Sequence, residues 1–125
     1  MKRGVQASLL AVTALLLTGA ASEMTVAEFL AGMKKAESLG PAALLSSDVR
    51  ALRAESDRVR ELYVADITRQ KKAGGKLHSC PPTSDRPKMT GEELRKYLSS
   101  LPASAQKKPF RVAVYDLMKK KFPCK

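Results

Sequence analysis

Residues 47–75 read SDVRALRAESDRVRELYVADITRQKKAGG, and this stretch decides the fold class. Side chains that suit a buried face recur in it at alternating steps of three and four residues, which is the spacing of one side of an α-helix. They are Val49, Leu52, Ser56, Val59 and Tyr63, with Leu62 and Ile67 widening the same stripe. This regular period predicts a long amphipathic helix that packs against the rest of the chain.

Both ends of this helix carry ordinary helix signals. Ser47 or Asp48 can begin it, and Gly74 and Gly75 can end it. The face opposite the stripe mixes arginines with acidic residues, and we interpret it as a solvated helix face rather than a binding site. Its charged residues are Arg50, Arg53, Arg58 and Arg60 with Glu55, Asp57 and Glu61.

Three further helices are predicted around the long one. Residues 24–40 and 89–102 each begin Met-Thr, and a glutamate follows the threonine three residues later, which is the capping-box spacing. Pro109 suits the first turn of a last helix over 109–122, which ends in three lysines. The positions expected to face the core are Val26, Phe29, Leu30 and Met33, then Leu94, Tyr97, Leu98 and Leu101, then Phe110, Ala113, Val114, Leu117 and Met118.

No segment alternates in the manner of a strand, so the predicted fold class is all-α, a small bundle of about four helices. Residues 41–47 are expected to form a short turn or a single helical turn. Residues 76–88 contain three prolines and are predicted to be a loop. The short connection between the last two helices predicts that these helices lie antiparallel.

The first 21 residues have the layout of a secretory signal peptide. Lys2 and Arg3 precede an apolar run over residues 9–17, and small residues lead to the expected cleavage site after Ala21. An uncleaved membrane anchor is the alternative, but the apolar run is shorter than the about 20 residues that a span requires. We therefore expect residues 22–125 to form one exported helical domain, periplasmic or secreted, that does not span a membrane.

The expected export determines how the two cysteines, Cys80 and Cys124, are interpreted. Disulfides persist outside the cytosol, so we predict one bridge between these residues, with an intermolecular bridge as the weaker alternative. Cys80 precedes the third predicted helix and Cys124 follows the last one. The bridge would therefore close the open end of the C-terminal helical hairpin, and closing a loop of this length stabilises the fold by about 4 kcal/mol.

Residues with catalytic or metal-binding chemistry are few. His78 is the only histidine, and it stands two residues before Cys80 in the sequence LHSCPP. A Cys–His nucleophile requires a free thiol, and a zinc site requires about four ligands, whereas the chain has one His and two Cys. We therefore predict that the protein is not an enzyme and that it binds no metal and no cofactor.

Positive charge gathers in the C-terminal part. Residues 22–85 contain ten Lys and Arg against nine Asp and Glu, whereas residues 86–125 contain eleven against three, a net charge of +8. This charge either serves solubility or forms a surface for an anionic partner, such as an acidic protein, lipid head groups or a cell-wall polymer. Export argues against nucleic acid, and the aromatic residues are not interleaved with the basic ones as a stacking platform requires.

The C-terminal half resembles a known family. The stretches SCPP at 79–82, MTGEELRKYLSSLP at 89–102 and KKPFRVAVYDLMKKKFPC at 107–124 are similar to the Rap/Tai-type immunity proteins of bacterial type VI secretion. The chain departs from that family in having no cysteine before Cys80, where the family has a second disulfide. It also lacks the family's Gly-Tyr element. The matching positions are Cys80, Pro81, Thr90, Leu94, Tyr97, Leu98, Pro102, Phe122, Pro123 and Cys124.

The resemblance implies a small exported helical protein that binds a cell-wall amidase effector and blocks it by surface complementarity, without chemistry of its own. The alternative is a small basic periplasmic protein, stress-related or envelope-binding, that uses its basic half on anionic surfaces or unfolded clients. Neither hypothesis names the residues that would contact a secreted effector or an anionic envelope surface, so the partner-binding residues stay unassigned.

Overall fold

The computed structural model describes residues 23–82 and 89–125, so the expected signal peptide lies outside the described residues. The described part is helical and contains no strand, which confirms the all-α prediction. Its elements are α1 (Val26–Leu39), the 3₁₀-helix η1 (Gly40–Leu45), α2 (Ser47–Ala73), α3 (Gly91–Ser100), α4 (Ala103–Gln106) and α5 (Phe110–Lys121). None of the described helices is both long enough and apolar enough to cross a membrane.

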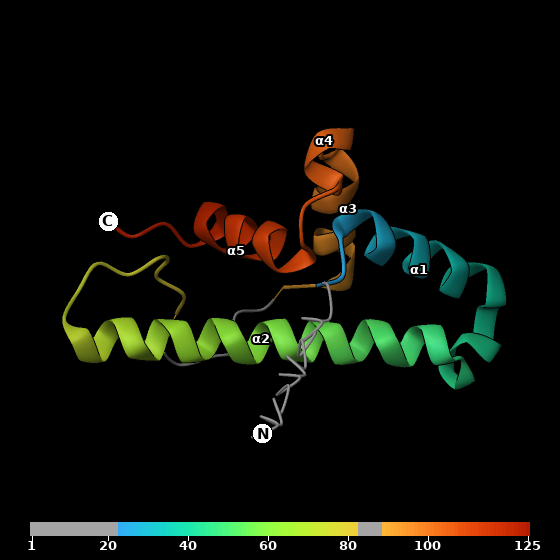
Figure 1. The fold of residues 1–125 in the computed structure, drawn as a ribbon, viewed down its shortest axis with the longest axis horizontal. Helices are drawn as coiled ribbons and strands as arrows, with labels where there is room; N and C mark the ends of the chain where they lie inside the picture. The colour runs from blue at the N-terminus through green and yellow to red at the C-terminus, as the bar shows by residue number, and fades with distance from the viewer. Residues whose placement is uncertain (1–22, 83–88) are drawn as a thin grey trace, which may run out of the picture.

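The long helix α2 runs along the whole length of the domain (Figure 1). α1 lies over one half of α2 and α5 lies over the other half, while α3 and α4 stand between them. Two backbone hydrogen bonds join the starts of α1 and α5, from Val26 N to Lys108 O at 3.0 Å and from Phe110 N to Met24 O at 2.8 Å. The two helices therefore diverge from one point, toward opposite ends of α2.

The ends of α1 and α2 follow the expected capping chemistry. Thr25 and Glu28 form the predicted capping box of α1, in which each side chain binds the other residue's backbone N–H. Ser46, one residue before the predicted start, caps α2 by accepting a hydrogen bond from Val49 N at 3.2 Å. Gly74 ends α2 at φ 66°, in the left-handed region that glycine enters without strain.

The C-terminal helices contain one element that the sequence did not predict. Thr90 caps α3 as expected, accepting from Glu93 N at 3.1 Å. The connection to the last helix is itself a single helical turn, α4, which begins after Pro102. The side-chain amide of Gln106 donates to Leu101 O at 3.0 Å and closes this turn. The predicted turn over 41–47 is also helical, as η1.

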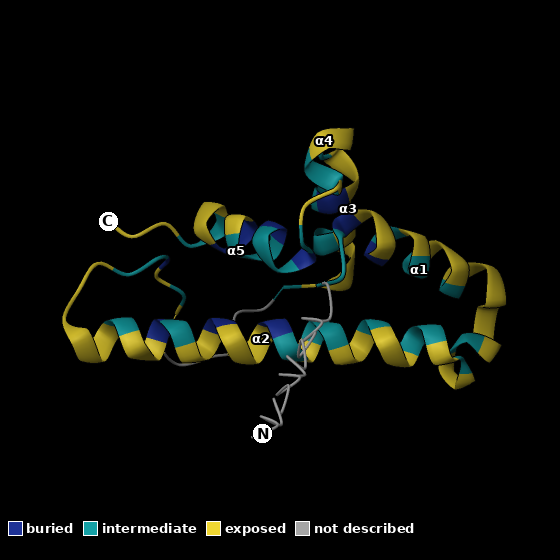
Figure 2. Ribbon diagram, in the orientation of Figure 1, coloured by how far each residue is buried: buried dark blue, intermediate teal, exposed yellow. Residues whose placement is uncertain are grey.

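The core consists of two apolar clusters (Figure 2). In the larger cluster the rings of Phe29 and Phe110 stack with their centroids 3.9 Å apart. Leu62, predicted on the buried stripe of α2, is 38% exposed, so that prediction is wrong at this position. The first cluster contains Val26, Phe29, Val59, Leu98, Phe110 and Ala113, and the second contains Tyr63, Ile67 and Met118.

The predicted disulfide between Cys80 and Cys124 is present, with its two sulfur atoms 2.03 Å apart. Cys80 N also donates to Phe122 O at 2.8 Å, so the tail pairs with the segment that follows α2. Lys121 Nζ lies 2.7 Å from Glu93 Oε2, which brings the end of α5 to the start of α3. The closure of the C-terminal helices by the bridge is thereby confirmed, and the start of α3 lies beside the end of α5 as the predicted hairpin requires.

Candidate functional site

A cavity of about 910 Å³ lies between α2, α3 and α5. Its floor is formed by core side chains, among them Phe110, which is 1% exposed, and Val59, which is also 1% exposed. The apolar residues that line it are Val59, Tyr63, Val64, Ala65, Met89, Leu94, Phe110, Val114 and Met118. Because these floor residues are held by the core, the cavity is a preformed feature of the fold.

Polar and charged side chains border this cavity along α2 and at the start of α3. Asp57 and Arg60 form an ion pair with 2.9 Å between Oδ1 and the guanidinium. Glu61 lies beside them, and Thr90 borders the opposite side. An apolar floor with a charged rim is the usual anatomy of a protein-binding surface.

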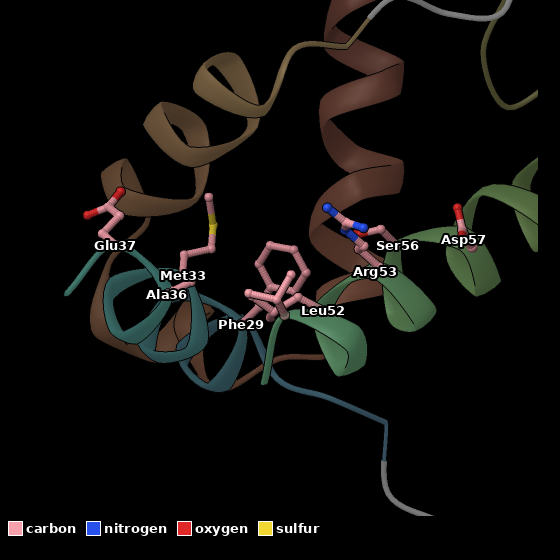
Figure 3. A pocket seen from close by; sticks show the side chains of 9 residues that line it. Phe29, Met33, Ala36, Glu37, Leu52, Arg53, Ser56 and Asp57 are labelled. Atoms are coloured by element: carbon pink, nitrogen blue, oxygen red, sulfur yellow. The ribbon is translucent and has the colours of Figure 1, made fainter. Parts of the chain in front are cut away.

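A second cavity of about 520 Å³ lies between α1 and the first half of α2 (Figure 3). Phe29 and Leu52 lie in its floor, with Met33 on the α1 side and Arg53 on the α2 side. Ser56 and Asp57 line this cavity and the larger one alike. The two cavities are therefore neighbours along one face of α2, and together we call them the α2 groove.

Ser56 is the residue from which this groove could have been predicted. It occupies a position in the predicted buried stripe of α2, where the neighbouring positions carry larger apolar side chains. In the structure Ser56 is only half-buried. A small polar side chain at a core-facing position leaves space that a leucine would have filled, so the stripe is interrupted where the two cavities meet.

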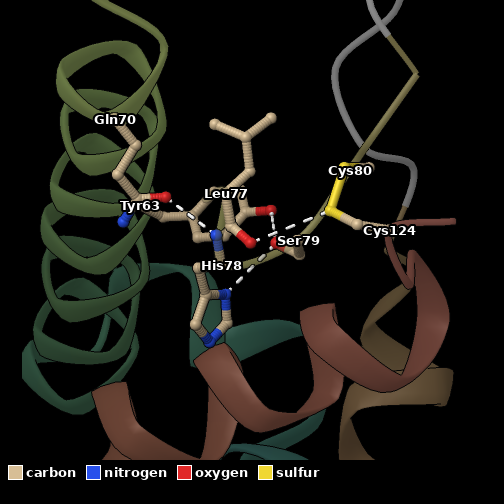
Figure 4. The surroundings of a disulfide bond; sticks show 7 residues. All are labelled: Tyr63, Gln70, Leu77, His78, Ser79, Cys80 and Cys124. Carbon is tan, nitrogen blue, oxygen red and sulfur yellow. Dashed lines mark hydrogen bonds between the residues drawn. A yellow bond between two sulfur atoms is a disulfide. The ribbon is translucent and has the colours of Figure 1, made fainter. Parts of the chain in front are cut away.

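A polar network surrounds the segment that leads to the disulfide (Figure 4). Ser79 is fully buried, and its hydroxyl is in a short hydrogen bond with the hydroxyl of Tyr63. His78 Nδ1 lies 3.2 Å from Ser79 Oγ, and His78 N donates to Gln70 Oε1 at 2.8 Å. Burial raises the pKa of Tyr63, which favours the neutral phenol that this hydrogen bond uses.

His78, Ser79 and Cys80 are thus all engaged in structural contacts. The Cys80 thiol is committed to the disulfide and is not free to act as a nucleophile. The imidazole of His78 packs 5.4 Å from the ring of Tyr115, centroid to centroid. Within residues 23–82 and 89–125, no group of three or more His, Cys, Asp and Glu side chains is arranged to hold a metal ion.

A hydrogen bond and an ion pair join parts of the chain that are distant in sequence. The Tyr115 hydroxyl donates to Asp66 Oδ2 at 2.6 Å, and this bond is the main reason why the pKa of Asp66 lies below its ordinary value. Arg111 Nε donates to Glu23 Oε1 at 2.9 Å and lowers the pKa of Glu23 in the same way. Sequence periodicity could not predict these pairs, because each joins residues far apart in the chain.

The basic C-terminal half is spread over α3, the α4–α5 connection and the end of α5. Lys121 pairs with Glu93, and the Nζ of Lys120 lies 5.1 Å from the centroid of the Tyr97 ring. The other exposed lysines in the described part of this half lie on several elements rather than around one hollow. They are Lys96, Lys107, Lys108, Lys119 and Lys125.

Comparison with protein-family models, with curated proteins and with solved structures found no match to this chain. The arrangement of the site residues is therefore the ground on which a function is proposed below.

Proposed function

We propose that this chain is an exported, non-catalytic binding protein of the immunity type, which binds a secreted cell-wall amidase effector and blocks it. The observation that carries the proposal is the α2 groove, with its apolar floor and charged rim. The resemblance of the C-terminal half to Rap/Tai-type immunity proteins supplies the class of partner. The groove supplies a surface on which a partner can be held.

The apolar floor of the groove and the disulfide that holds α5 support this proposal. Anchor side chains of a partner contribute most to affinity when they enter well-packed apolar pockets from which water is excluded. Phe110, Val114 and Met118 present such a floor, and α5 is tied to the segment after α2 through the disulfide. A groove that is already formed in the free protein spares the partner the cost of ordering it.

A binding experiment with an amidase effector encoded beside this gene tests the proposal. Val64 is 52% exposed on the rim of the groove, so Val64→Arg should leave the fold intact and obstruct the groove. We expect at least a tenfold loss of affinity by calorimetry and a matching loss of protection in cells that receive the effector.

Leu62→Arg is the matched control, because Leu62 is also exposed on α2 but does not line the groove. It should bind and protect like the unaltered protein. If the unaltered protein forms no complex with the effector and rescues no cells, the immunity function is wrong. If Val64→Arg binds as well as Leu62→Arg, the effector is bound somewhere other than the groove.

The exposed lysines favour a second candidate function, that of a basic protein which binds the anionic envelope, for example cell-wall polymers. The double substitution Lys119→Glu and Lys120→Glu changes two exposed residues at the end of α5. Pelleting with cell-wall sacculi should then fall sharply, and pelleting of the unaltered protein should weaken as salt is added. Pelleting that is unaffected by salt and by these substitutions would exclude this candidate.

A further inference from the structure

Three leucines are exposed together where α1 turns into α2. Leu39 is 40% exposed, Leu44 is 66% exposed and Leu45 is 84% exposed. The turn between α1 and α2 that carries them lies at the right-hand end of the view in Figure 1, and most of this turn has the exposed colour in Figure 2. A protruding apolar turn does not enclose a small ligand. It can instead insert into the surface of a larger partner.

The backbone presents these leucines on a fixed turn. Gly40 ends α1 at φ 57°, a conformation that glycine adopts without strain, and Pro41 follows it in the first turn of η1. At the other end Ser46 caps α2, and its hydroxyl also donates to Ala43 O at 2.9 Å. Leu44 and Leu45 stand between these two fixed points, so little conformational freedom would be lost when they are buried.

Positive charges flank the leucines along the chain, on the last turns of α1 and the first turn of α2. Lys34 on α1 and Arg50 on α2 are exposed and have no ion-pair partner within the described residues. The nearby carboxylates are already neutralised, since Asp48 pairs with Lys35 at 2.9 Å and Glu37 pairs with Arg95. The tip is therefore apolar at its end and cationic at its base.

We propose that this turn, residues 39–45, inserts into the surface of an anionic phospholipid bilayer and anchors the protein there. Exposed apolar side chains enter the boundary between head groups and acyl chains, while cations at the level of the head groups attract anionic lipid. The inference does not depend on the α2 groove, because none of residues 39–45 lines either of its cavities. An anchored protein would keep the groove available to a partner that reaches the membrane.

A second copy of this chain is a poorer fit to the same tip. A stable protein interface buries about 800 Å² on each partner, which is well beyond what three leucine side chains on a narrow turn can supply. The unpaired cations Lys34 and Arg50 would also face their own copies across a symmetric contact. Anionic lipid head groups would attract these two cations, whereas a second copy of the chain would bring like charges together.

A fluorescent reporter tests insertion directly, because the chain contains no tryptophan. Leu45→Trp places a single indole at the tip, and Leu62→Trp places one on an exposed part of α2 as the control. With vesicles that contain phosphatidylglycerol, we expect a blue shift and quenching by brominated acyl chains for Leu45→Trp only. An unshifted Leu45→Trp spectrum, or equal shifts in both variants, would overturn the proposal.

Vesicle flotation gives an independent measurement that does not rely on a new aromatic residue. The double substitution Leu44→Asp and Leu45→Asp should weaken partition to phosphatidylglycerol vesicles at least about tenfold, because two apolar side chains no longer leave water. Leu62→Asp should partition like the unaltered protein. Equal partition of the double variant and the unaltered protein would contradict membrane insertion. So would concentration-dependent dimers of the unaltered protein, seen by ultracentrifugation, that the double substitution abolishes. Effector binding by the double variant separates this result from any failure of the proposed immunity function.

Discussion

The two ends of α2 differ in how they are held. The disulfide end, made of residues 59–82, α5 and the tail, contains the buried residues Tyr63, Ile67 and Met118 and the bridge between Cys80 and Cys124. The corner, residues 30–58, contains no buried residue at all. One end of the helix is therefore fixed by burial and a covalent bond, and the other is held by half-buried contacts and surface ion pairs.

This difference predicts that the two ends of the molecule differ in local stability. Regions with few buried apolar contacts open at low free-energy cost, whereas core elements open only when the whole domain unfolds. The corner carries the smaller cavity and the two most exposed leucines, Leu44 and Leu45, whereas Leu62 at the disulfide end is 38% exposed. Substitutions at the two ends should accordingly have very unequal effects on stability.

The largest expected effect comes from the disulfide. Cys124→Ser opens a loop with a sequence separation of 44, which should lower the free energy of unfolding by about 4 kcal/mol. For a domain of this size the melting temperature should fall by roughly 20 °C, measured by circular dichroism. Reductant should destabilise the unaltered protein by a similar amount and leave the variant unchanged. Melting that is indifferent to both treatments would mean that burial alone holds the disulfide end.

A matched pair of truncations compares the two ends directly. Ile67→Ala removes a side chain that is 6% exposed at the disulfide end and should cost about 3 kcal/mol, because a cavity is left in a packed cluster. Leu45→Ala removes a side chain that is 84% exposed at the corner and should change stability by less than about 0.5 kcal/mol. Urea unfolding of both variants measures the contrast, and similar costs would show that the corner is packed in solution.

Tyr115→Phe probes the polar contacts of the disulfide end. It removes the hydrogen bond to Asp66 and should cost about 1–2 kcal/mol at neutral pH. Since this bond lowers the pKa of folded Asp66, its contribution is fully present above the ordinary carboxyl pKa and is lost as the pH falls through the lowered value. Urea unfolding at neutral pH and in strong acid should therefore show a gap between the two proteins that closes in acid. If the difference in unfolding free energy persists unchanged in acid, the effect of the substitution does not come from the Asp66 carboxylate.

A last substitution tests whether the corner can adjust to an added methyl group. A methyl group added at Gly32 would approach Leu52 Cδ2 to 2.9 Å, which is too close unless Leu52 moves. Leu52 borders the smaller cavity, so it has space to move into, and alanine suits a helix interior better than glycine by about 1 kcal/mol. Gly32→Ala should therefore be neutral or up to about 1 kcal/mol more stable in urea unfolding. A loss of more than about 1 kcal/mol would show a corner as rigid as the disulfide end.

Much of the fold could be predicted because its signals are local. Thr25, Ser46 and Gly74 satisfy backbone groups within a few residues of themselves, and these contacts depend on neighbouring sequence alone. Two cysteines allow a single internal pairing, and that pairing is present. The candidate site could not be predicted to the same extent, because a groove consists of the space that side chains leave empty.

The sequence by itself determined the helices, most of their ends, the stripe on each and the partner of each cysteine. Only the tertiary structure decided how much of each stripe is covered, because α2 is longer than either helix that packs on it. Val59, Tyr63 and Ile67 are buried beneath neighbouring elements, while Leu62, on the margin of the same stripe, remains exposed. Hydrogen bonding and periodicity act within one helix, whereas burial depends on where a second helix crosses the first, and that crossing created both the α2 groove and the exposed corner.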